Sequence, residues 1–132
     1  ALIAVSHAQE VGVDLECVRS EVEVMKLSKR YFTRSEHTAI MQAPEEQRAM
    51  RFFRYWVAKE ALLKAQGIGL RGLSDCEIVP EADGVDVEVR TRLGPQFTDT
   101  LQVRLLSCET GWQAAVAAQS LDSVTQFDLE QE

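Results

Sequence analysis

Apolar and polar residues alternate in the first part of the chain, a pattern typical of β-strands. Residues 1–5, ALIAV, and residues 10–16, EVGVDLE, are short and rich in β-forming residues, and SHAQ separates them. In the second segment, Val11, Val13 and Leu15 fall on one face of the strand, and Gly12, Asp14 and Glu16 fall on the other. We therefore predict a β-hairpin in this part of the chain.

The period of the pattern then lengthens to that of helices. VMKLSKRYF, residues 24–32, predicts a short helix. Thr33, with Glu36 three residues later, forms a capping-box sequence, so a second helix is expected to begin near Arg34.

The longest helix is predicted from Glu45 to Gln66, where apolar positions recur every three or four residues. Pro44 suits its first turn, because proline is well tolerated there. Gly67 and Gly69 are expected to end it, since glycine readily adopts the left-handed conformation that closes many helices.

The rest of the chain returns to an alternating pattern. CEIV, the turn segment PEAD with Gly84, and VDVEVRTRL predict a β-hairpin, and TLQVRLLSC and WQAAVAAQ predict two further strands. The fold class is therefore α+β, with an antiparallel sheet packed against one long helix and shorter helices. Residues 1–120 are expected to form a single domain, and residues 121–132 a polar, acidic tail that frays.

Length and composition bound the class of protein. A chain of 132 residues with 45% hydrophobic residues fits one globular domain. No apolar run approaches the roughly 20 residues of a membrane span, and the first residues lack the pattern of a signal peptide, so we expect a soluble cytoplasmic protein. Cys17, Cys76 and Cys108 match no zinc or redox spacing and are predicted to be reduced, partly buried thiols.

The formal net charge of −7 is unevenly distributed. Residues 17–74 carry eleven Lys or Arg against six Glu, whereas the flanking segments are acidic. A basic middle is compatible with a phosphate-bearing ligand or an acidic partner, and the overall acidity disfavours duplex DNA. Solvated surface charges without any ligand would give the same distribution.

Two charges fall within the apolar stripe of the long helix. At about 100° per residue, Lys64 lies within roughly 60° of Glu60 around the helix axis. The same arc holds Phe53, Trp56, Val57 and Leu63. Burying an unpaired ion is costly, so a site must supply partners for both charges. The alternative is a Glu–Lys pair one turn apart at the edge of the stripe.

Asp14 and Glu16 could join Glu60 in one ligand site. Alternate residues of a strand lie about 6.6 Å apart and point the same way, so two carboxylates can converge on one cation. Three hard oxygen donors suit Mg²⁺, which substrate phosphates often complete, and zinc is disfavoured because no His or Cys accompanies them. Surface acids on a hairpin remain the alternative.

The two charged segments together resemble a known family. VGVDLE, followed some forty residues later by WVAKEALLKA, resembles the paired signature of the 4′-phosphopantetheinyl transferases. YFTRSEHTAI, GIGLRGL and GWQAAVAA extend the resemblance over nearly the whole chain. The acidic residue at the end of VDLE and the preceding ALIAV resemble the carboxyl-terminal lobe of the two-lobed, surfactin-synthetase-activating type. The shorter holo-acyl-carrier-protein synthase type usually begins almost at the Gly-x-Asp strand.

The resemblance implies a reaction and roles for particular residues. Such enzymes transfer the phosphopantetheine arm of coenzyme A to a serine of an apo acyl or peptidyl carrier protein, in fatty acid, polyketide or nonribosomal peptide biosynthesis. By resemblance, Asp14, Glu16 and Glu60 bind Mg²⁺, and Lys64 contacts the pyrophosphate. Lys59 reaches the phosphates or the ribose. Gly69, with Gly67, lets the backbone turn beside the pantetheine. Glu60 and Lys64 are the expected catalytic residues, with Glu60 as the candidate base for the serine proton.

Other basic residues have weaker implied roles. Arg48, Arg51 and Arg54 recur on the long helix and could face an acidic carrier or the 3′-phosphate. His7 and His37 match no functional position of the family and are predicted to be exposed.

The resemblance also leaves alternatives. In two-lobed relatives, a first lobe helps to hold the nucleotide, and this sequence contains no such lobe. Either the chain is a fragment, or copies associate as a homo-oligomer that completes the site. A non-catalytic Mg²⁺- and coenzyme A-binding or carrier-docking lobe is the main alternative, and a purely structural domain is a third.

Overall fold

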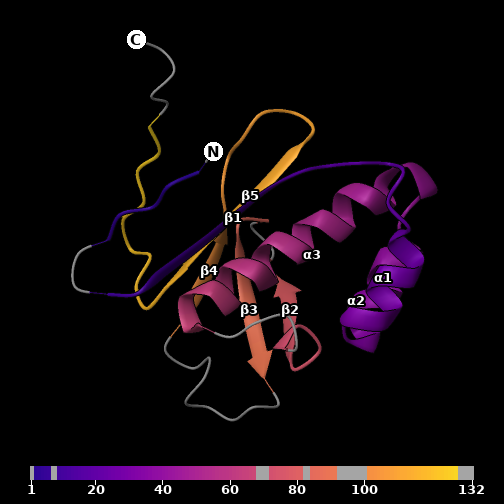
Figure 1. Cartoon of the computed structure of the whole chain (residues 1–132), viewed down its shortest axis with the longest axis horizontal. Coiled ribbons are helices and arrows are strands. Elements are labelled where there is room, and N and C mark those ends of the chain that lie inside the picture. Colours follow the sequence, from indigo (N-terminus) through magenta and orange to yellow (C-terminus); the bar gives the residue numbers. More distant parts are fainter. Residues whose placement is uncertain (1, 7–8, 68–71, 82–83, 92–100, 128–132) are drawn as a thin grey trace.

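The computed structural model describes residues 2–6, 9–67, 72–81, 84–91 and 101–127. Five strands and three helices follow one another along this part of the chain (Figure 1). Their order is β1 (Val11–Cys17), α1 (Val24–Tyr31), α2 (Arg34–Gln42), α3 (Glu45–Gln66), β2 (Cys76–Pro80), β3 (Asp86–Thr91), β4 (Gln102–Leu105) and β5 (Trp112–Ala118). The predicted α+β class is confirmed.

The strands form one antiparallel sheet in the order β1-β5-β4-β3-β2. The predicted hairpin of β2 and β3 is present. The predicted hairpin at the start of the chain is wrong, because residues 2–6 form no strand. Instead β1 pairs with β5, with Val11 opposite Ala118 and Cys17 opposite Trp112. The alternating pattern identified β1 as a strand but could not identify its partner.

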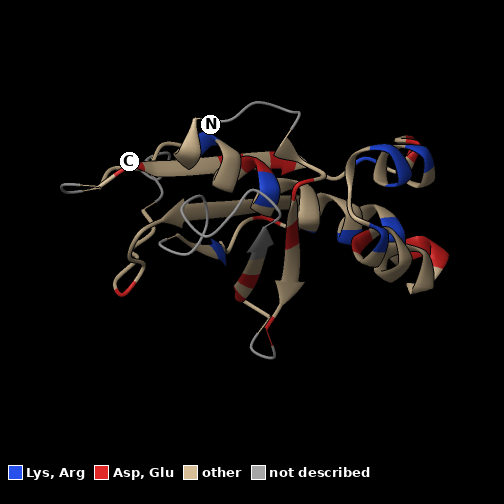
Figure 2. Ribbon diagram, turned by 90° about the horizontal axis from the view of Figure 1, so that it is seen from below, with Lys and Arg blue, Asp and Glu red and all other residues tan. Residues whose placement is uncertain are grey.

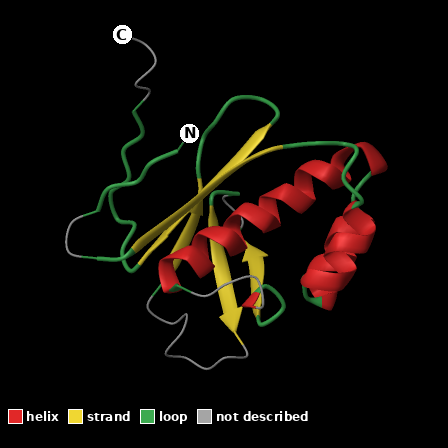
Figure 3. Cartoon of the chain, in the orientation of Figure 1, coloured by secondary structure: helices red, strands yellow, loops and turns green. Residues whose placement is uncertain are grey.

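Helix α3 lies across one face of the sheet (Figures 1 and 3). Helices α1 and α2 lie together beside one end of the sheet. The main core fills the space between α3 and the strands. Its fully buried residues include Val57, Ala58, Ala61 and Leu62 of α3 and Ala115 and Ala117 of β5. Phe32, which follows α1, stacks on Phe52 of α3 with ring centroids 5.1 Å apart. Aromatic packing therefore joins the short helices to the long one.

The helix ends follow the local sequence signals. Thr33 caps α2 with both hydrogen bonds of a capping box, the side chain accepting from Glu36 N and the Glu36 side chain accepting from Thr33 N. Pro44 is the N-cap residue of α3, one position before the first turn in which it was predicted. Gly67 ends α3 with φ 73°, a left-handed conformation that suits glycine. Gly69 lies outside the described residues.

The opposite face of the sheet carries a smaller apolar cluster. Val116 and Ala118 of β5 are buried there with Leu121. Leu121 N donates to Gln102 Oε1 at 2.9 Å, and the Gln126 side chain bonds both N and O of Ser107. Leu121, which was predicted to begin the tail, is therefore buried against the sheet.

The remaining predictions concern cysteines and membrane spans. All three cysteines are free, as predicted, with Cys76 buried, Cys17 half-buried and Cys108 exposed. Within the described ranges, none of the helices combines the length and the apolar character that a bilayer crossing needs.

Candidate functional site

The site begins with an unusually close contact between β1 and α3 at Gly12. A Cβ atom at this position would lie 2.1 Å from Ala61 O and 2.5 Å from Ala65 N, both backbone atoms of α3. Only glycine allows strand and helix to approach so closely. Because strand residues alternate in direction, Asp14 and Glu16 lie on the same face of β1 as Gly12. This contact therefore brings two acidic positions of the strand to the helix.

Asp14 meets Lys64 across this contact. Lys64 Nζ donates to Asp14 Oδ1 at 2.8 Å and lies 3.3 Å from Val13 O. The Asp14 side chain is 7% exposed and that of Lys64 is 51% exposed. The second carboxylate oxygen of Asp14, Oδ2, is buried and has no hydrogen-bond partner. A buried carboxylate oxygen without a donor is costly, so Asp14 retains the capacity to bind a cation or a further donor.

Glu16 and Glu60 are electrostatically coupled to this pair. Burial raises the pKa of Glu60, and the negative charges of Asp14 and Glu16 raise it further, whereas Lys64 lowers it. Burial also raises the pKa of Glu16, with Asp14 as the second cause. The hydrogen bond that Lys64 donates to Asp14 is the largest cause that raises the pKa of Lys64. The structure thus brings Asp14 into contact with Lys64, and Glu16 and Glu60 lie close enough for their charges to affect this pair.

Three carboxylates and one ammonium leave this site with an excess of negative charge. Their oxygens are the hard donors that Mg²⁺ prefers. No three acidic, His or Cys side chains of the described residues already converge as ligands of one ion. The donor set and the unpartnered Asp14 Oδ2 fit a divalent cation chemically. The side chains are not held in ligand positions in advance.

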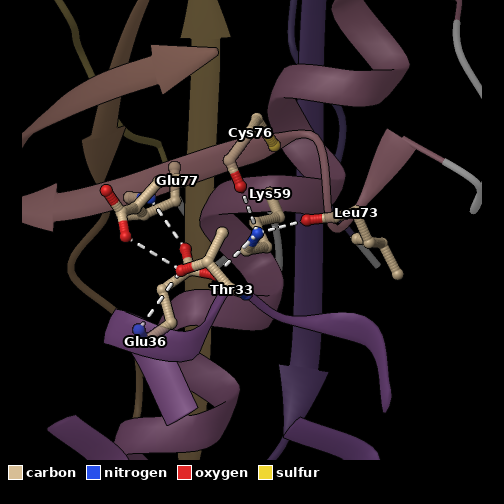
Figure 4. Close-up of polar contacts among 7 residues, drawn as sticks. Thr33, Glu36, Lys59, Leu73, Cys76 and Glu77 are labelled. Carbon is tan, nitrogen blue, oxygen red and sulfur yellow. Dashed lines mark hydrogen bonds and ion pairs between the residues drawn. The ribbon is translucent and has the colours of Figure 1, made fainter. Parts of the chain in front are cut away.

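Lys59 is not part of this acidic site, and the predicted contact with phosphates or ribose does not fit its position. The Lys59 side chain is fully buried, and Nζ lies 2.8 Å from Glu36 Oε1. It also donates to the carbonyl oxygens of Leu73 and Cys76. The ammonium is therefore enclosed between α2 and the start of β2 (Figure 4). Residues 59 and 60 point about 100° apart around a helix, which is why they face different surroundings.

The degree of burial also differs from the helical-wheel expectation. Glu60 is half-buried, whereas Lys64 is exposed. Phe53, Val57 and Leu63 are buried as predicted. The fully buried charge of α3 is Lys59, which the wheel placed outside the stripe. A helical wheel shows only which residues share a face of α3. It does not include the burial that α2 and β2 cause on another side of the helix.

Other basic residues also differ from expectation. Arg48 and Arg51 donate to the carbonyl oxygens of Ala43, Met41 and Ala39, and so tie α3 to the end of α2. His37 is half-buried rather than exposed, with Nδ1 2.6 Å from the hydroxyl oxygen of the buried Ser28. His7 lies outside the described residues.

Sequence reasoning missed two neighbours of Glu16. The Arg19 guanidinium lies over the Phe53 ring, 5.1 Å from its centroid, and its charge lowers the pKa of Glu16. The Trp56 side chain lowers that pKa as well, through a hydrogen bond. The available signal for Arg19 was its position just after the strand that carries Asp14 and Glu16.

Comparison with known proteins adds sequence and fold relationships. HetI, a 4′-phosphopantetheinyl transferase of Nostoc sp., is 42% identical over 78 residues, which are 59% of this chain and 33% of HetI. The chain thus spans about a third of the length of HetI. The holo-[acyl-carrier-protein] synthase of Chloroflexus aggregans is 34% identical over 113 residues, covering 73% of this chain and 81% of that protein.

A solved structure has the same fold. The holo-(acyl-carrier-protein) synthase of Bacillus anthracis, crystallised in complex with CoA (3′,5′-ADP), matches with a TM-score of 0.65 at 21% identity, over 84% of this chain and 96% of that one. The family model for the 4′-phosphopantetheinyl transferase superfamily matches residues 10–117, from the start of β1 almost to the end of β5. On this match, the chain belongs to the 4′-phosphopantetheinyl transferase superfamily.

Proposed function

We propose that this chain takes part in the Mg²⁺-dependent transfer of the 4′-phosphopantetheine arm of coenzyme A to a serine of an apo acyl or peptidyl carrier protein. The observation that carries the proposal is the Asp14–Lys64 contact beside Glu16 and Glu60, at the junction of β1 and α3. This junction combines the two segments that resemble the family signature. The similarity to HetI, a 4′-phosphopantetheinyl transferase, and to the Chloroflexus holo-[acyl-carrier-protein] synthase supports the same reaction class.

Asp14, Glu16 and Glu60 would hold the metal ion in this proposal. Bound there, Mg²⁺ would supply positive charge to phosphate oxygens, which is the main electrostatic requirement of phosphoryl transfer. Support comes from the excess negative charge of the site and from Asp14 Oδ2, which has no hydrogen-bond partner.

Lys64 would bind the pyrophosphate of coenzyme A. Its side chain is 51% exposed, so the ammonium can reach a ligand while it remains close to Asp14. Its raised pKa keeps it protonated at neutral pH. A protonated lysine at this position would also stabilise the negative charge that develops on the leaving phosphate.

Glu60 would accept the proton of the carrier serine. Burial and the neighbouring carboxylates raise the pKa of Glu60 above the ordinary value in the metal-free protein. A carboxylate that donates to a metal ion is a weaker base, so Glu60 would accept the proton directly or through a water molecule. Conversion of Glu60 to Gln would then abolish turnover. A variant that kept full turnover and lost only metal affinity would overturn this role.

An acidic carrier protein fits the surface of the short helices. Exposed basic residues lie along α1 and at the start of α2, and Figure 2 shows Lys and Arg on both helices. These residues are Lys26, Lys29, Arg30 and Arg34. Such a surface would attract an acidic partner. The reaction would take place in the cytoplasm, the compartment expected from the sequence.

The chain would correspond to the carboxyl-terminal lobe of the two-lobed type. Its site would then be completed by a preceding lobe or by a second copy of the chain. The alternative is a lobe that binds Mg²⁺ and coenzyme A or docks a carrier without turnover by itself. The carrier-docking form of this alternative is favoured by one observation, namely that no three potential ligands in the described ranges already converge on one ion.

Calorimetric titration of coenzyme A into the chain, with and without Mg²⁺, tests the proposal. Binding that needs Mg²⁺ and is lost in Glu60→Ala would support the acidic site as the ligand site. Glu88→Ala, on β3, is a matched control that should bind like the wild type. Addition of an apo carrier protein, followed by mass spectrometry, then separates the two alternatives. Modified carrier supports transfer, and binding without modification supports a lobe that is inactive alone.

A further inference from the structure

The Lys59 ammonium has no hydrogen-bonding capacity left for a ligand. A lysine ammonium donates three N–H groups. Lys59 Nζ has three oxygen partners: Glu36 Oε1 at 2.8 Å, Cys76 O at 2.5 Å and Leu73 O. It also lies over the Phe32 ring, 5.2 Å from the centroid. All its N–H groups are therefore used inside the protein.

Glu36 extends these contacts to three elements of the fold. Its Oε1 atom accepts from Thr33 N at the start of α2, and Oε2 accepts from Ile78 N of β2 at 2.7 Å. Thr33 Oγ1 in turn donates to Glu77 Oε1 at 2.9 Å. Figure 4 shows these groups converging around Lys59. One side of α3 is thus attached to α2 and to β2 by directional polar bonds.

A second attachment acts on α3 within about two turns of Lys59. At Gly12, β1 lies so close to Ala61 and Ala65 that no side chain fits between strand and helix. Lys59 therefore fixes one side of the helix, and the Gly12 contact fixes another. Glu60 and Lys64 belong to the same helical stretch as these two attachments. Their positions relative to Asp14 depend on the rotation of α3 about its own axis.

Stability alone does not explain a buried ion pair at this place. Removing two charges from water costs so much that apolar residues of similar size are often as stabilising or more so. Hydrogen bonds to fixed acceptors define a direction as well as a distance, whereas apolar contacts are not directional.

We propose that Lys59 is a positioning residue, which with Glu36 sets the rotation of α3 so that Glu60 and Lys64 meet Asp14. This inference rests on the proposed function for the role of the site in catalysis. The contacts of Lys59 and Glu36 do not depend on that function. It assigns the lysine of the WVAKE segment to the support of the site rather than to ligand binding. The bonds to Leu73 and Cys76 also fix the segment by which the chain returns from α3 to β2.

The experiment compares Lys59→Met with the double variant Glu36→Gln/Lys59→Met. The single variant leaves the Glu36 carboxylate buried without its cation, which destabilises the fold. The double variant removes that charge and keeps an acceptor for Thr33 N or Ile78 N. Arg104→Met, which breaks the partly exposed pair with Asp86, is a control for loss of an ion pair away from the site.

The expected result separates stability from positioning. Relative to Lys59→Met, the double variant should regain much of the lost melting temperature, while kcat stays lower than in the wild type on the order of tenfold to hundredfold. The KM for coenzyme A should rise together with the fall in kcat, because Lys64, which binds the pyrophosphate in the proposed function, is displaced. Arg104→Met should keep the wild-type kcat.

Two results would overturn the inference. One is a double variant with wild-type kcat, which would make the pair purely structural. The other is a higher KM for coenzyme A with unchanged kcat, which would make Lys59 a ligand contact.

An NMR measurement tests the positioning of α3 by Lys59 independently of activity. The backbone amide signals of Gly12 and Lys64 should shift in the double variant and not in Arg104→Met. If they do not shift, the positioning role is wrong even where the enzyme is active. If the wild type neither binds coenzyme A nor transfers its arm, the proposed function fails, and the NMR shifts still decide the role of Lys59.

Discussion

Lys64 pairs with Asp14, fifty positions earlier in the chain, rather than with Glu60 one turn away on its own helix. Asp14 is nearly buried, and a buried carboxylate needs a cation or hydrogen-bond donors more than the half-buried Glu60 does. The contact joins β1 to α3 and places the charged end of Lys64 within the acidic site. Four predictions follow from this site and from the contacts that support it.

Asp14→Asn should abolish Mg²⁺-dependent binding of coenzyme A with a small effect on stability. The amide keeps the size of the side chain but removes the charge that would attract the metal. Since Lys64 is half exposed, loss of its ion pair should change the free energy of unfolding by no more than about 1 kcal/mol. Calorimetric titration and urea unfolding measure the two effects.

Asp86→Asn is the matched control for Asp14→Asn. It makes the same chemical change in the pair with Arg104, on β3 and away from the site. It should leave binding of coenzyme A unchanged. Equal loss of binding in both variants would contradict the assignment of the acidic site.

Gly12→Ala should destabilise the protein by about 1–3 kcal/mol, the usual range for overpacking. The added Cβ would meet Ala61 O at 2.1 Å, so β1 and α3 would have to separate. Binding of coenzyme A should weaken as well, because Asp14 would move away from Lys64. Denaturant unfolding and calorimetry check both effects.

Gly84→Ala is the control for Gly12→Ala. Gly84 has φ 74°, and no atom lies within 4 Å of a Cβ there. Alanine should therefore cost only the backbone strain, about 1–2 kcal/mol, and binding should be retained. Loss of binding in this variant would show that destabilisation alone explains the effect at Gly12.

Glu60→Gln should stabilise the metal-free protein at neutral pH. The pKa of Glu60 is raised above 4.5 in the folded state, so this state binds its proton more tightly than the unfolded chain does. Stability contributed by protonation is complete below the unfolded pKa and is lost as pH rises through the folded pKa. Glutamine mimics the protonated form and should remove this loss.

Melting temperatures measured from pH 4 to pH 8 without divalent metal test this sign. The difference between Glu60→Gln and the wild type should grow as pH rises from 4.5 through the raised folded-state pKa, and then level off. A Glu60→Gln protein that is less stable than the wild type at pH 7 would contradict the effect of burial.

Thr33→Ala should cost about 1 kcal/mol of stability, the typical effect of losing an N-cap side chain. Thr33 accepts from Glu36 N and donates to Glu77 Oε1, and both contacts hold the start of α2 next to β2. Because Glu36 supports Lys59, a smaller decrease in kcat is also expected. Unfolding measurements on Thr38→Ala, an exposed threonine of the same helix, provide the comparison. Equal effects of the two changes would show that the cap contributes nothing specific.

The sequence predicted elements best where the signal is local. Helix α3 has the bounds predicted for it, Glu45 to Gln66, because a period of three to four residues and a terminal glycine are properties of the segment itself. The capping box of Thr33 and Glu36 is local in the same way. The approach of Asp14, Glu16, Glu60 and Lys64 was inferred from two such segments and from the family resemblance.

Predictions that required a partner fared worse. Residues 1–5 were predicted to pair with β1 in a hairpin. Instead, β1 pairs with β5, which is distant in the sequence. His37 was expected at the surface, but it bonds Ser28 of α1. Leu121 was assigned to a frayed tail, but it packs on the back of the sheet.

The sequence by itself determined the helices, the later strands and the set of charged residues, because spacing along a helix or strand sets which side chains share a face. Only the tertiary structure decided which charges are buried and which are free. Lys59 and Glu60 are neighbours in the chain, yet α2 and β2 enclose the first while the second lies at the acidic site. The environment of a side chain depends on every element that packs around it, and no local pattern contains that information.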